Sequence, residues 1–347
     1  MHHDGEHVRG QGREAAVIGT GGNHKLKIFS GRANRPLAEA IARHLGVPLG
    51  NINLGAFPDG ETMVRIDEDV RGRDVFVVQP TCPPVNQNLM ELLIILDAFK
   101  RASPARITAV IPYYGYARQD RKDTGRVPIS AKLVADLLTT AGAHRVLCLD
   151  LHAAQIQGFF NIPVDHLYAS KEITGHVRGL NIPTDELVIL STDEGNVKKA
   201  LKYQEGLRAT QLAVVDKRRS SATETKAAHL IGSPVDGKTV VVFDDMISTA
   251  TSMVNAINIA RRHGAKKVYA CATHGLLVDQ AVARLRDAGL EQIAVTDSVP
   301  LSAEARQLTN VKVIPVGALL ANAIRRIHED QSISELFRDD PPAAERR

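Results

Sequence analysis

The sequence of 347 residues contains no tryptophan and only three cysteines, Cys82, Cys148 and Cys271. These cysteines are odd in number, far apart and not arranged as a Cys-x-x-Cys pair. This pattern argues against a disulfide framework and against a structural zinc site. We therefore expect three reduced thiols that are mostly buried.

Long apolar runs and a strong charge bias are also missing. The aliphatic stretch at residues 92–96 ends at Asp97 and falls far short of the ~20 residues of a membrane helix. The first 25 residues lack the apolar segment of a secretory signal. Lys and Arg total 43 against 39 Asp and Glu, a surplus too small for a dedicated nucleic-acid binder. We expect a cytoplasmic protein with a mobile tail over residues 1–25, and neither a membrane nor a nucleic-acid partner.

The chain does contain short β-rich runs that alternate with amphipathic helices, which indicates the α/β class. Because the strands are apolar on both faces and separated by helices, we expect mainly parallel sheets flanked by helices. Asn88 and Glu91 are expected to form a capping box at the start of one helix. The expected strands are 26–29, 75–78, 107–111, 146–149, 188–190, 212–215, 240–243 and 268–272, and the expected helices are 34–45, 88–100, 130–141 and 249–263.

A strand–helix–strand unit beginning at Gly72 is repeated from Gly237, with similar length and spacing. This repeat predicts two related α/β domains. We place the first at residues 26–168 and the second at residues 169–328. Residues 329–347 are expected to pack partly on the first domain and to end in a disordered segment.

The strongest local signal follows the apolar run 240–243. Asp244 and Asp245 come at the carboxyl end of this predicted strand, where parallel α/β sheets bind their ligands. Residues 248–252 then supply small hydroxyl side chains at the start of a helix, whose free N–H groups favour an anion. This pattern suits a phosphorylated sugar.

Two further clusters follow other predicted strands. Lys217, Arg218 and Arg219 form a run of cations that suits a loop closing on polyphosphate. Asp150 and His152 stand two residues apart at a strand end, so both side chains point to the same side, as metal or phosphate ligation requires.

These motifs resemble those of type I phosphoribosyltransferases and, over residues 26–338, those of the ribose-phosphate diphosphokinases (PRPP synthetases). The resemblance implies two tandem phosphoribosyltransferase-like domains, with ATP bound on the first and ribose 5-phosphate on the second. It implies a homo-oligomer, a hexamer in much of the family. The matching segments are 57–61, 88–92, 112–121, 150–153, 155–160, 216–219, 244–252, 272–275 and 323–327.

The resemblance also implies a role for individual residues. The diphosphoryl group of Mg-ATP would pass to the C1 hydroxyl of ribose 5-phosphate, giving PRPP and AMP. The loop at residues 57–61 would reach the adenine end from a neighbouring subunit. The implied residues are Lys217 and Arg219 for catalysis; Phe57, Asp59, Gly60, Glu61, Arg118 and Gln119 for ATP; Arg219, Asp244, Asp245, Ser248, Thr249, Ala250, Thr251 and Ser252 for ribose 5-phosphate; and His152 and Asp193 for Mg²⁺.

Some positions depart from the family pattern. The common sugar-phosphate loop has two glycines where this chain has Ala250 and Thr251, and these residues permit close backbone approach to phosphate only if the loop stays at negative φ. Asn196 replaces a usual glycine after Asp193, and Asn161 stands where many relatives have aspartate. Two alternatives remain open: a non-catalytic regulatory homologue that binds nucleotide, and a phosphoribosyltransferase that consumes PRPP.

Overall fold

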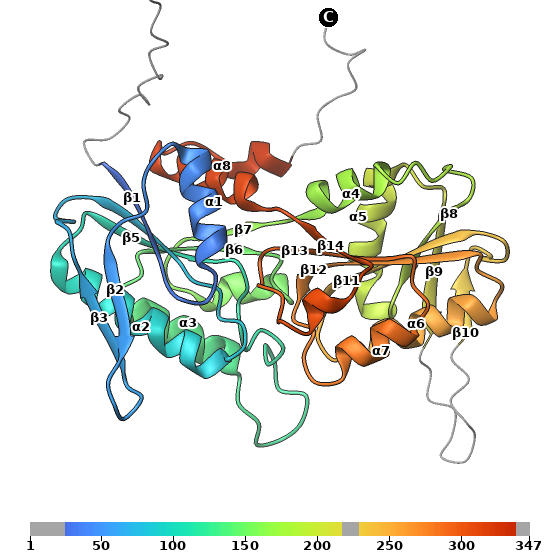
Figure 1. Ribbon diagram of the computed structural model, residues 1–347, viewed down its shortest axis with the longest axis horizontal. Helices are drawn as coiled ribbons and strands as arrows, with labels where there is room; N and C mark the ends of the chain where they lie inside the picture. The colour runs from blue at the N-terminus through green and yellow to red at the C-terminus, as the bar shows by residue number, and fades with distance from the viewer. Residues whose placement is uncertain (1–24, 217–228, 338–347) are drawn as a thin grey trace, which may run out of the picture.

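Two helix-flanked sheets dominate the computed structural model, which describes residues 25–216 and 229–337 (Figure 1). All neighbouring strands of the first sheet are parallel, in the order β1-β4-β5-β6-β7. The predicted α/β class with mainly parallel sheets is confirmed. The strands of this sheet are β1 (Leu26–Ser30), β4 (Asp74–Val78), β5 (Arg106–Ile111), β6 (Arg145–Leu149) and β7 (Val164–Leu167).

The second sheet has the order β10-β9-β8-β11-β12-β13-β14, and only β10 runs antiparallel to its neighbour. At its centre, β8 is buried throughout and β11 is buried over residues 239–243, as expected of a sheet covered on both faces. They are β8 (Leu187–Ser191), β9 (Gln211–Asp216), β10 (His229–Gly232), β11 (Thr239–Ile247), β12 (Lys267–Gly275), β13 (Gln292–Thr296) and β14 (Val311–Ile314).

An antiparallel hairpin stands apart from both sheets. Its strands are β2 (Ile52–Ala56) and β3 (Thr62–Ile66), and the turn between them contains the predicted ATP-contact loop. Figure 1 shows the hairpin projecting from the side of the first sheet. The alternation of apolar and polar residues here is too weak to have predicted either strand.

Helices cover both faces of each sheet. α2 (Val85–Ala102) and α3 (Ser130–Ala141) pack on one face of the first sheet, and α6 (Thr251–Arg262) and α7 (Ala281–Asp287) pack on one face of the second. The opposite faces share one apolar cluster, which joins α1 (Arg35–Leu45) to the helices of the second half. Those helices are α4 (Ser170–Arg178), α5 (Val197–Leu207) and α8 (Gly317–His328).

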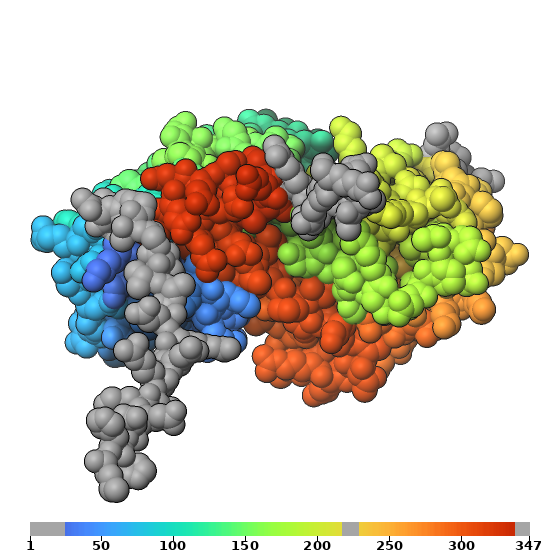
Figure 2. Space-filling view, turned by 90° about the horizontal axis from the view of Figure 1, so that it is seen from above, coloured from blue at the N-terminus to red at the C-terminus, as the bar shows by residue number. Residues whose placement is uncertain are grey.

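The C-terminal helix connects the two halves. α8 follows the second sheet in sequence but packs against α1 of the first half, as Figure 2 shows for this red segment. The Asp74 carboxylate, which is buried, accepts hydrogen bonds from Arg106 Nε at 2.9 Å and pairs with His328 Nδ1 at 2.8 Å. The domain limits at residues 168 and 328 stay a prediction, and residues 1–24 and 338–347 of the predicted tails lie outside the described residues.

Several local predictions can be compared directly. Asn34 caps α1, as its position before the helix suggests. The capping box is wrong: α2 begins at Val85, so Asn88 lies inside the helix and donates its amide to the Cys82 carbonyl at 2.8 Å. Glu91 instead accepts hydrogen bonds from Arg32 and Gln79. The three cysteines are buried and unpaired, as expected. Within the described part of the chain, no helix is long and apolar enough to cross a membrane.

Candidate functional site

The two predicted ribose-binding carboxylates lie at the end of the central strand β11. The strand runs to Ile247, four residues beyond its predicted end, so Asp244 and Asp245 belong to it. Successive side chains of a strand point to opposite faces. The two carboxylates consequently enter different environments.

Asp245 faces the first half of the molecule. Its Oδ2 lies 2.7 Å from His152 Nδ1 and 3.4 Å from Lys199 Nζ. Lys199 Nζ also donates to the His152 carbonyl at 3.4 Å. Because His152 follows β6 and Lys199 lies on α5, this cluster joins residues from both sheets.

Asp244 is held by its own half of the molecule. Its Oδ2 accepts a hydrogen bond from Thr192 Oγ1 at 3.0 Å, and its Oδ1 accepts one from Asn196 Nδ2 at 2.9 Å. The Asp245 backbone N–H also donates to Asp244 Oδ1, at 2.8 Å. Thr192 and Asn196 flank Asp193 at the end of β8.

The pKa values of the two carboxyl groups move in opposite directions. Burial raises the pKa of Asp244, and the hydrogen bond and charge of Asp245 raise it further, to about 7. Burial would also raise the pKa of Asp245, but the hydrogen bond from His152 and the charge of Lys199 hold that pKa well below its usual value. At neutral pH the pair therefore contains one firmly ionised carboxylate and one that titrates.

Asp150 fixes the strand end that carries His152. Its backbone has φ 39°, and its Oδ2 accepts hydrogen bonds from the Ala169 backbone N–H at 2.9 Å and from Thr273 Oγ1 at 2.6 Å. The Asp150 carbonyl lies 3.1 Å from His274 Nε2. Thr273 and His274 belong to β12, so Asp150 joins the end of β6 to the second sheet and orients the segment that begins with His152.

The predicted phosphate loop leads into α6. Ala250 adopts φ 62°, so the condition of negative φ is not met at that residue. The left-handed conformation costs a non-glycine residue roughly 1–2 kcal/mol. Thr249 Oγ1 lies 3.2 Å from Thr251 Oγ1, and the Thr249 carbonyl accepts a hydrogen bond from Arg284 Nη1 at 2.7 Å. The hydroxyls of this turn and a guanidinium therefore lie together at the N-terminus of a helix, which favours an anion.

The predicted ATP residues occupy two separate places. Burial raises the pKa of Tyr113, and the nearby guanidinium of Arg118 partly offsets that rise. The Tyr113 ring packs edge-on against His274, with ring centroids 5.0 Å apart. This contact places Arg118 beside the junction of the two sheets. Gln119 pairs with Ser130 at the start of α3. The other predicted residues, Phe57, Asp59, Gly60 and Glu61, form the tip of the β2–β3 hairpin.

The hairpin tip is closed by its own hydrogen bonds. The Phe57 N–H donates to the Glu61 carbonyl at 2.8 Å, and Gly60, at φ 95°, donates its N–H to the Phe57 carbonyl at 2.9 Å. The Phe57 side chain is exposed. Lys217 and Arg219, the predicted catalytic residues, lie outside the described residues.

Comparison with known proteins identifies the family. A family model described as the N-terminal domain of ribose phosphate pyrophosphokinase matches residues 26–142, and one described as the phosphoribosyl synthetase-associated domain matches residues 219–338. A curated ribose-phosphate pyrophosphokinase from Rhodopirellula baltica is 58% identical over 315 residues, covering 91% of this chain and 99% of the relative. The chain belongs to the ribose-phosphate pyrophosphokinase family. Another member, from Caldanaerobacter subterraneus, is 51% identical and covers 90% of this chain and 98% of the relative.

A solved structure of the same family shares most of this architecture. The crystal structure of phosphoribosylpyrophosphate synthetase from Mycobacterium smegmatis superposes with a TM-score of 0.83 at 44% identity, covering 88% of this chain and 99% of that one. The fold predicted from the family resemblance is therefore confirmed.

Sequence reasoning missed four residues that contact the predicted pyrophosphokinase site. Lys199 pairs with Asp245, Thr192 and Asn196 hold Asp244, and Arg284 supports the phosphate loop. No motif marks Lys199 or Arg284, because each reaches the site only through the folding of α5 or α7. Asn196 carried a signal, since it departs from the family pattern, but its contact with Asp244 needed the structure.

The donor set is compatible with a magnesium ion shared with a substrate. Within the described residues, no group of three or more His, Cys, Asp or Glu side chains could hold a metal by itself. Mg²⁺ usually keeps several waters and binds through one or two carboxylates together with substrate phosphates, so a complete protein cage is not required. Asp193 is the carboxylate predicted for this role. Its Oδ1 also accepts the Asn196 backbone N–H at 3.1 Å, which fixes the orientation of the group.

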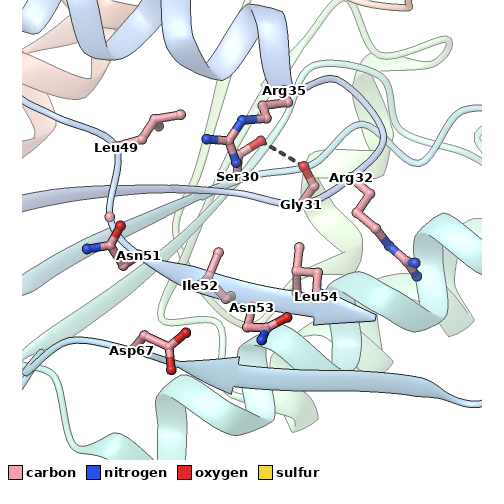
Figure 3. A pocket seen from close by; sticks show the side chains of 11 residues that line it. Ser30, Gly31, Arg32, Arg35, Leu49, Asn51, Ile52, Asn53, Leu54 and Asp67 are labelled. Atoms are coloured by element: carbon pink, nitrogen blue, oxygen red, sulfur yellow. Dashed lines mark hydrogen bonds between the residues drawn. The ribbon is translucent and has the colours of Figure 1, made fainter. Parts of the chain in front are cut away.

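A cavity of about 650 Å³ lies between β1, the start of α1 and the hairpin strand β2, and its lining residues are not those of this site (Figure 3). Arg32 and Arg35 line it on one side, and Asn53 lies on the other. Arg32 is paired with Glu91, and Arg35 Nε is 2.9 Å from Glu39. Both guanidinium groups are thus paired with neighbouring carboxylates, and Asp67 also lines the cavity.

Proposed function

We propose that this protein is an ATP-dependent diphosphotransferase that converts ribose 5-phosphate and ATP to PRPP and AMP. Relatives with 46–58% identity carry the name ribose-phosphate pyrophosphokinase. The observation that carries the proposal is the contact between His152 and Asp245, which brings the predicted metal-binding and ribose-binding segments together from two different sheets. In the reaction, the C1 hydroxyl oxygen bonds to the β-phosphorus of ATP, the bond from that phosphorus to the α,β-bridging oxygen breaks, AMP leaves and the hydroxyl proton is released.

Each part of the site has a distinct role in this proposal. Asp244 and Asp245 accept hydrogen bonds from the ribose hydroxyls. The loop at residues 248–252 binds the 5-phosphate. Lys217 and Arg219, on the segment after β9, neutralise the diphosphoryl group during transfer. Catalysis then depends mainly on positioning and on charge stabilisation, as in other phosphoryl transfers.

Magnesium is the cofactor that we propose for this site, held by His152 and Asp193 together with ATP. When bound, it would neutralise phosphate oxygens and so favour departure of AMP. The second metal-site residue, His152, has its Nδ1 engaged by Asp245, which fixes the ring. We expect Asp193→Asn to raise the Mg²⁺ concentration needed for half-maximal activity.

We further propose that the protein works as a homo-oligomer, with a hexamer as the expected size. The hairpin tip at residues 57–61 bonds to itself in this chain and exposes 49% of Phe57. An exposed aromatic at the end of a projecting hairpin suits stacking on adenine in a neighbouring subunit. A cytoplasmic location is consistent with the three buried thiols, since no disulfide joins them.

The test is direct measurement of AMP and PRPP from ATP and ribose 5-phosphate, with Mg²⁺ and inorganic phosphate present. We expect turnover in the native chain and a loss of at least about a hundredfold in Lys217→Ala, because a cation at the transferred group contributes several kcal/mol. Nucleotide binding without any turnover would instead support the regulatory homologue. Release of pyrophosphate from PRPP and a nucleobase would support a phosphoribosyltransferase.

A further inference from the structure

Asn196 connects two carboxylates to which different ligands are assigned. It ends the short 3₁₀ turn Glu194–Asn196, directly before α5. Its backbone N–H donates to Asp193 Oδ1 at 3.1 Å, and its side-chain amide donates to Asp244 Oδ1 at 2.9 Å. One residue thus contacts both the proposed metal ligand and the proposed ribose ligand.

The amide belongs to a closed ring of hydrogen bonds. Asn196 Nδ2 also donates to Thr192 Oγ1 at 3.1 Å, and that hydroxyl donates to Asp244 Oδ2 at 3.0 Å. The ring uses both amide protons of Asn196 and the single hydroxyl proton of Thr192. Since each donor is used once, the arrangement allows one orientation of the Asp244 carboxylate.

The ring also determines which lone pairs of Asp244 remain for a ligand. Each carboxylate oxygen can accept two hydrogen bonds. Oδ1 already accepts two, from Asn196 Nδ2 and from the Asp245 N–H, whereas Oδ2 accepts one, from Thr192. When Asp244 is ionised, Oδ2 therefore has the remaining acceptor position; when Asp244 is protonated, its proton is available to the neighbouring Asp245 carboxylate.

We propose that Asn196 is a positioning residue that orients Asp244, so that the remaining lone pair of Oδ2 receives a pentose hydroxyl. This inference rests on the proposed function, because it takes Asp244 as a ribose ligand. Asn196 acts through Asp244 and does not itself touch the substrate. Its side chain should therefore affect ribose 5-phosphate and leave ATP largely unaffected.

The test compares Asn196→Ala and Asn196→Gly with the native chain by steady-state kinetics. Both variants keep the backbone N–H that Asp193 accepts and lose only the side-chain donors. We expect the KM for ribose 5-phosphate to rise about tenfold, as for loss of a hydrogen bond to a charged group. The KM for ATP and kcat should stay within about twofold. Glu205→Ala, at an exposed position later in α5, is the matched control and should leave all three constants unchanged.

Asp244→Asn separates failure of this inference from failure of the proposed function. If Asp244→Asn raises the KM for ribose 5-phosphate and both Asn196 variants leave it unchanged, Asn196 has no positioning role and the proposed function stands. If Asp244→Asn leaves that KM unchanged, Asp244 is not a ribose ligand and the positioning role of Asn196 is overturned. The proposed function fails only if the native chain forms no AMP and PRPP. In the double variant Asn196→Ala/Asp244→Asn, we expect no increase beyond that of Asp244→Asn, because the two changes remove one interaction. Full additivity, or an equal rise in the KM for ATP, would overturn the positioning role.

Discussion

At the scale of single residues, the site separates two adjacent aspartates by environment. Asp245 pairs with an imidazole and an ammonium group, whereas Asp244 accepts only neutral donors and lies beside the charge of Asp245. The sequence predicted that both would hold a sugar but not that their pKa values would diverge. That difference depends on the burial of Asp244 beside Asp245, and on His152 and Lys199, which reach Asp245 only in the folded chain.

The titration of Asp244 gives a prediction for activity against pH. Its pKa of about 7 lies above the ordinary 3.8, so the carboxyl group takes up a proton as the pH falls through 7 and loses acceptor capacity. We expect kcat/KM for ribose 5-phosphate to fall below pH 7 by up to about tenfold per pH unit. The substrate phosphate also titrates in this range, so the profile is compared with that of Asp244→Asn. If kcat/KM falls below pH 7 in the same way in the native chain and in Asp244→Asn, the titrating group is not Asp244.

Lys199 gives a second prediction at this scale. Lys199→Met removes the cation near Asp245 Oδ2 and the donor to the His152 carbonyl. The pKa of Asp245 should rise and His152 should be less well oriented, so we expect kcat/KM to fall about tenfold, as for one lost charged hydrogen bond.

Lys198→Met, at the neighbouring exposed position, is the control and should be nearly silent. Lys199→Arg should retain most of the activity. A similar loss in the Lys198 and Lys199 variants would point to a general effect of charge.

At the scale of helices and strands, periodicity identified the elements with strong patterns. The helices at α1, α3 and α6 and most of the buried strands were predicted within a few residues, because apolar spacing, end residues and length all agreed. The hairpin β2–β3 and the strands β7, β10, β13 and β14 were missed. The edge strands β10 and β14 are largely exposed and lack a continuous apolar run, whereas β13 is buried and its apolar run is only three residues long. The capping box failed because α2 starts one turn earlier than its apolar stripe suggests.

The docking of α8 onto the first half gives a prediction for stability. Asp74 is buried, and although burial alone would raise its pKa, His328 and Arg106 lower it below 3.8. Asp74→Asn should lower the free energy of unfolding at pH 7 by about 3 kcal/mol, the cost of removing one partner from a buried ion pair.

Because the folded pKa of Asp74 is depressed, its contribution is present above pH 4 and is lost as the pH falls through the folded value. Thermal melting at pH 7 and pH 3 checks this prediction. The difference in melting temperature between the native chain and Asp74→Asn should be smaller at pH 3. Asp97→Asn, which removes an exposed pair with Arg101, should leave the melting temperature nearly unchanged. An equal difference in melting temperature at both pH values would contradict the electrostatic explanation.

At the scale of the whole molecule, the site depends on how the two halves meet. The shared apolar cluster and the bond from Asn34 Nδ2 to the Asp297 carbonyl, at 2.8 Å, hold the first half against the second. His152 and Asp245 are separated by 93 residues, and local patterning contains no information on such a contact. Motif order predicted which segments matter, and only the packing of the two sheets determines which of them touch.

The projecting hairpin gives the last prediction, since it places part of the ATP site beyond a single chain. If Phe57 acts on a neighbouring subunit while Lys217 acts in its own, a Phe57→Ala protein and a Lys217→Ala protein should each be nearly inactive alone. Mixed oligomers, formed by co-expression with two different affinity tags and purified on both, then contain some sites with an intact Phe57 from one subunit and an intact Lys217 from the other. We expect these oligomers to recover a measurable fraction of native activity, up to about a quarter for random pairing of subunits at each site.

Mixtures prepared from two batches of Phe57→Ala, tagged in the same way, should recover none. If the doubly purified oligomers recover no activity although both parent proteins are folded, Phe57 and Lys217 act in the site of one chain and no neighbouring subunit is needed.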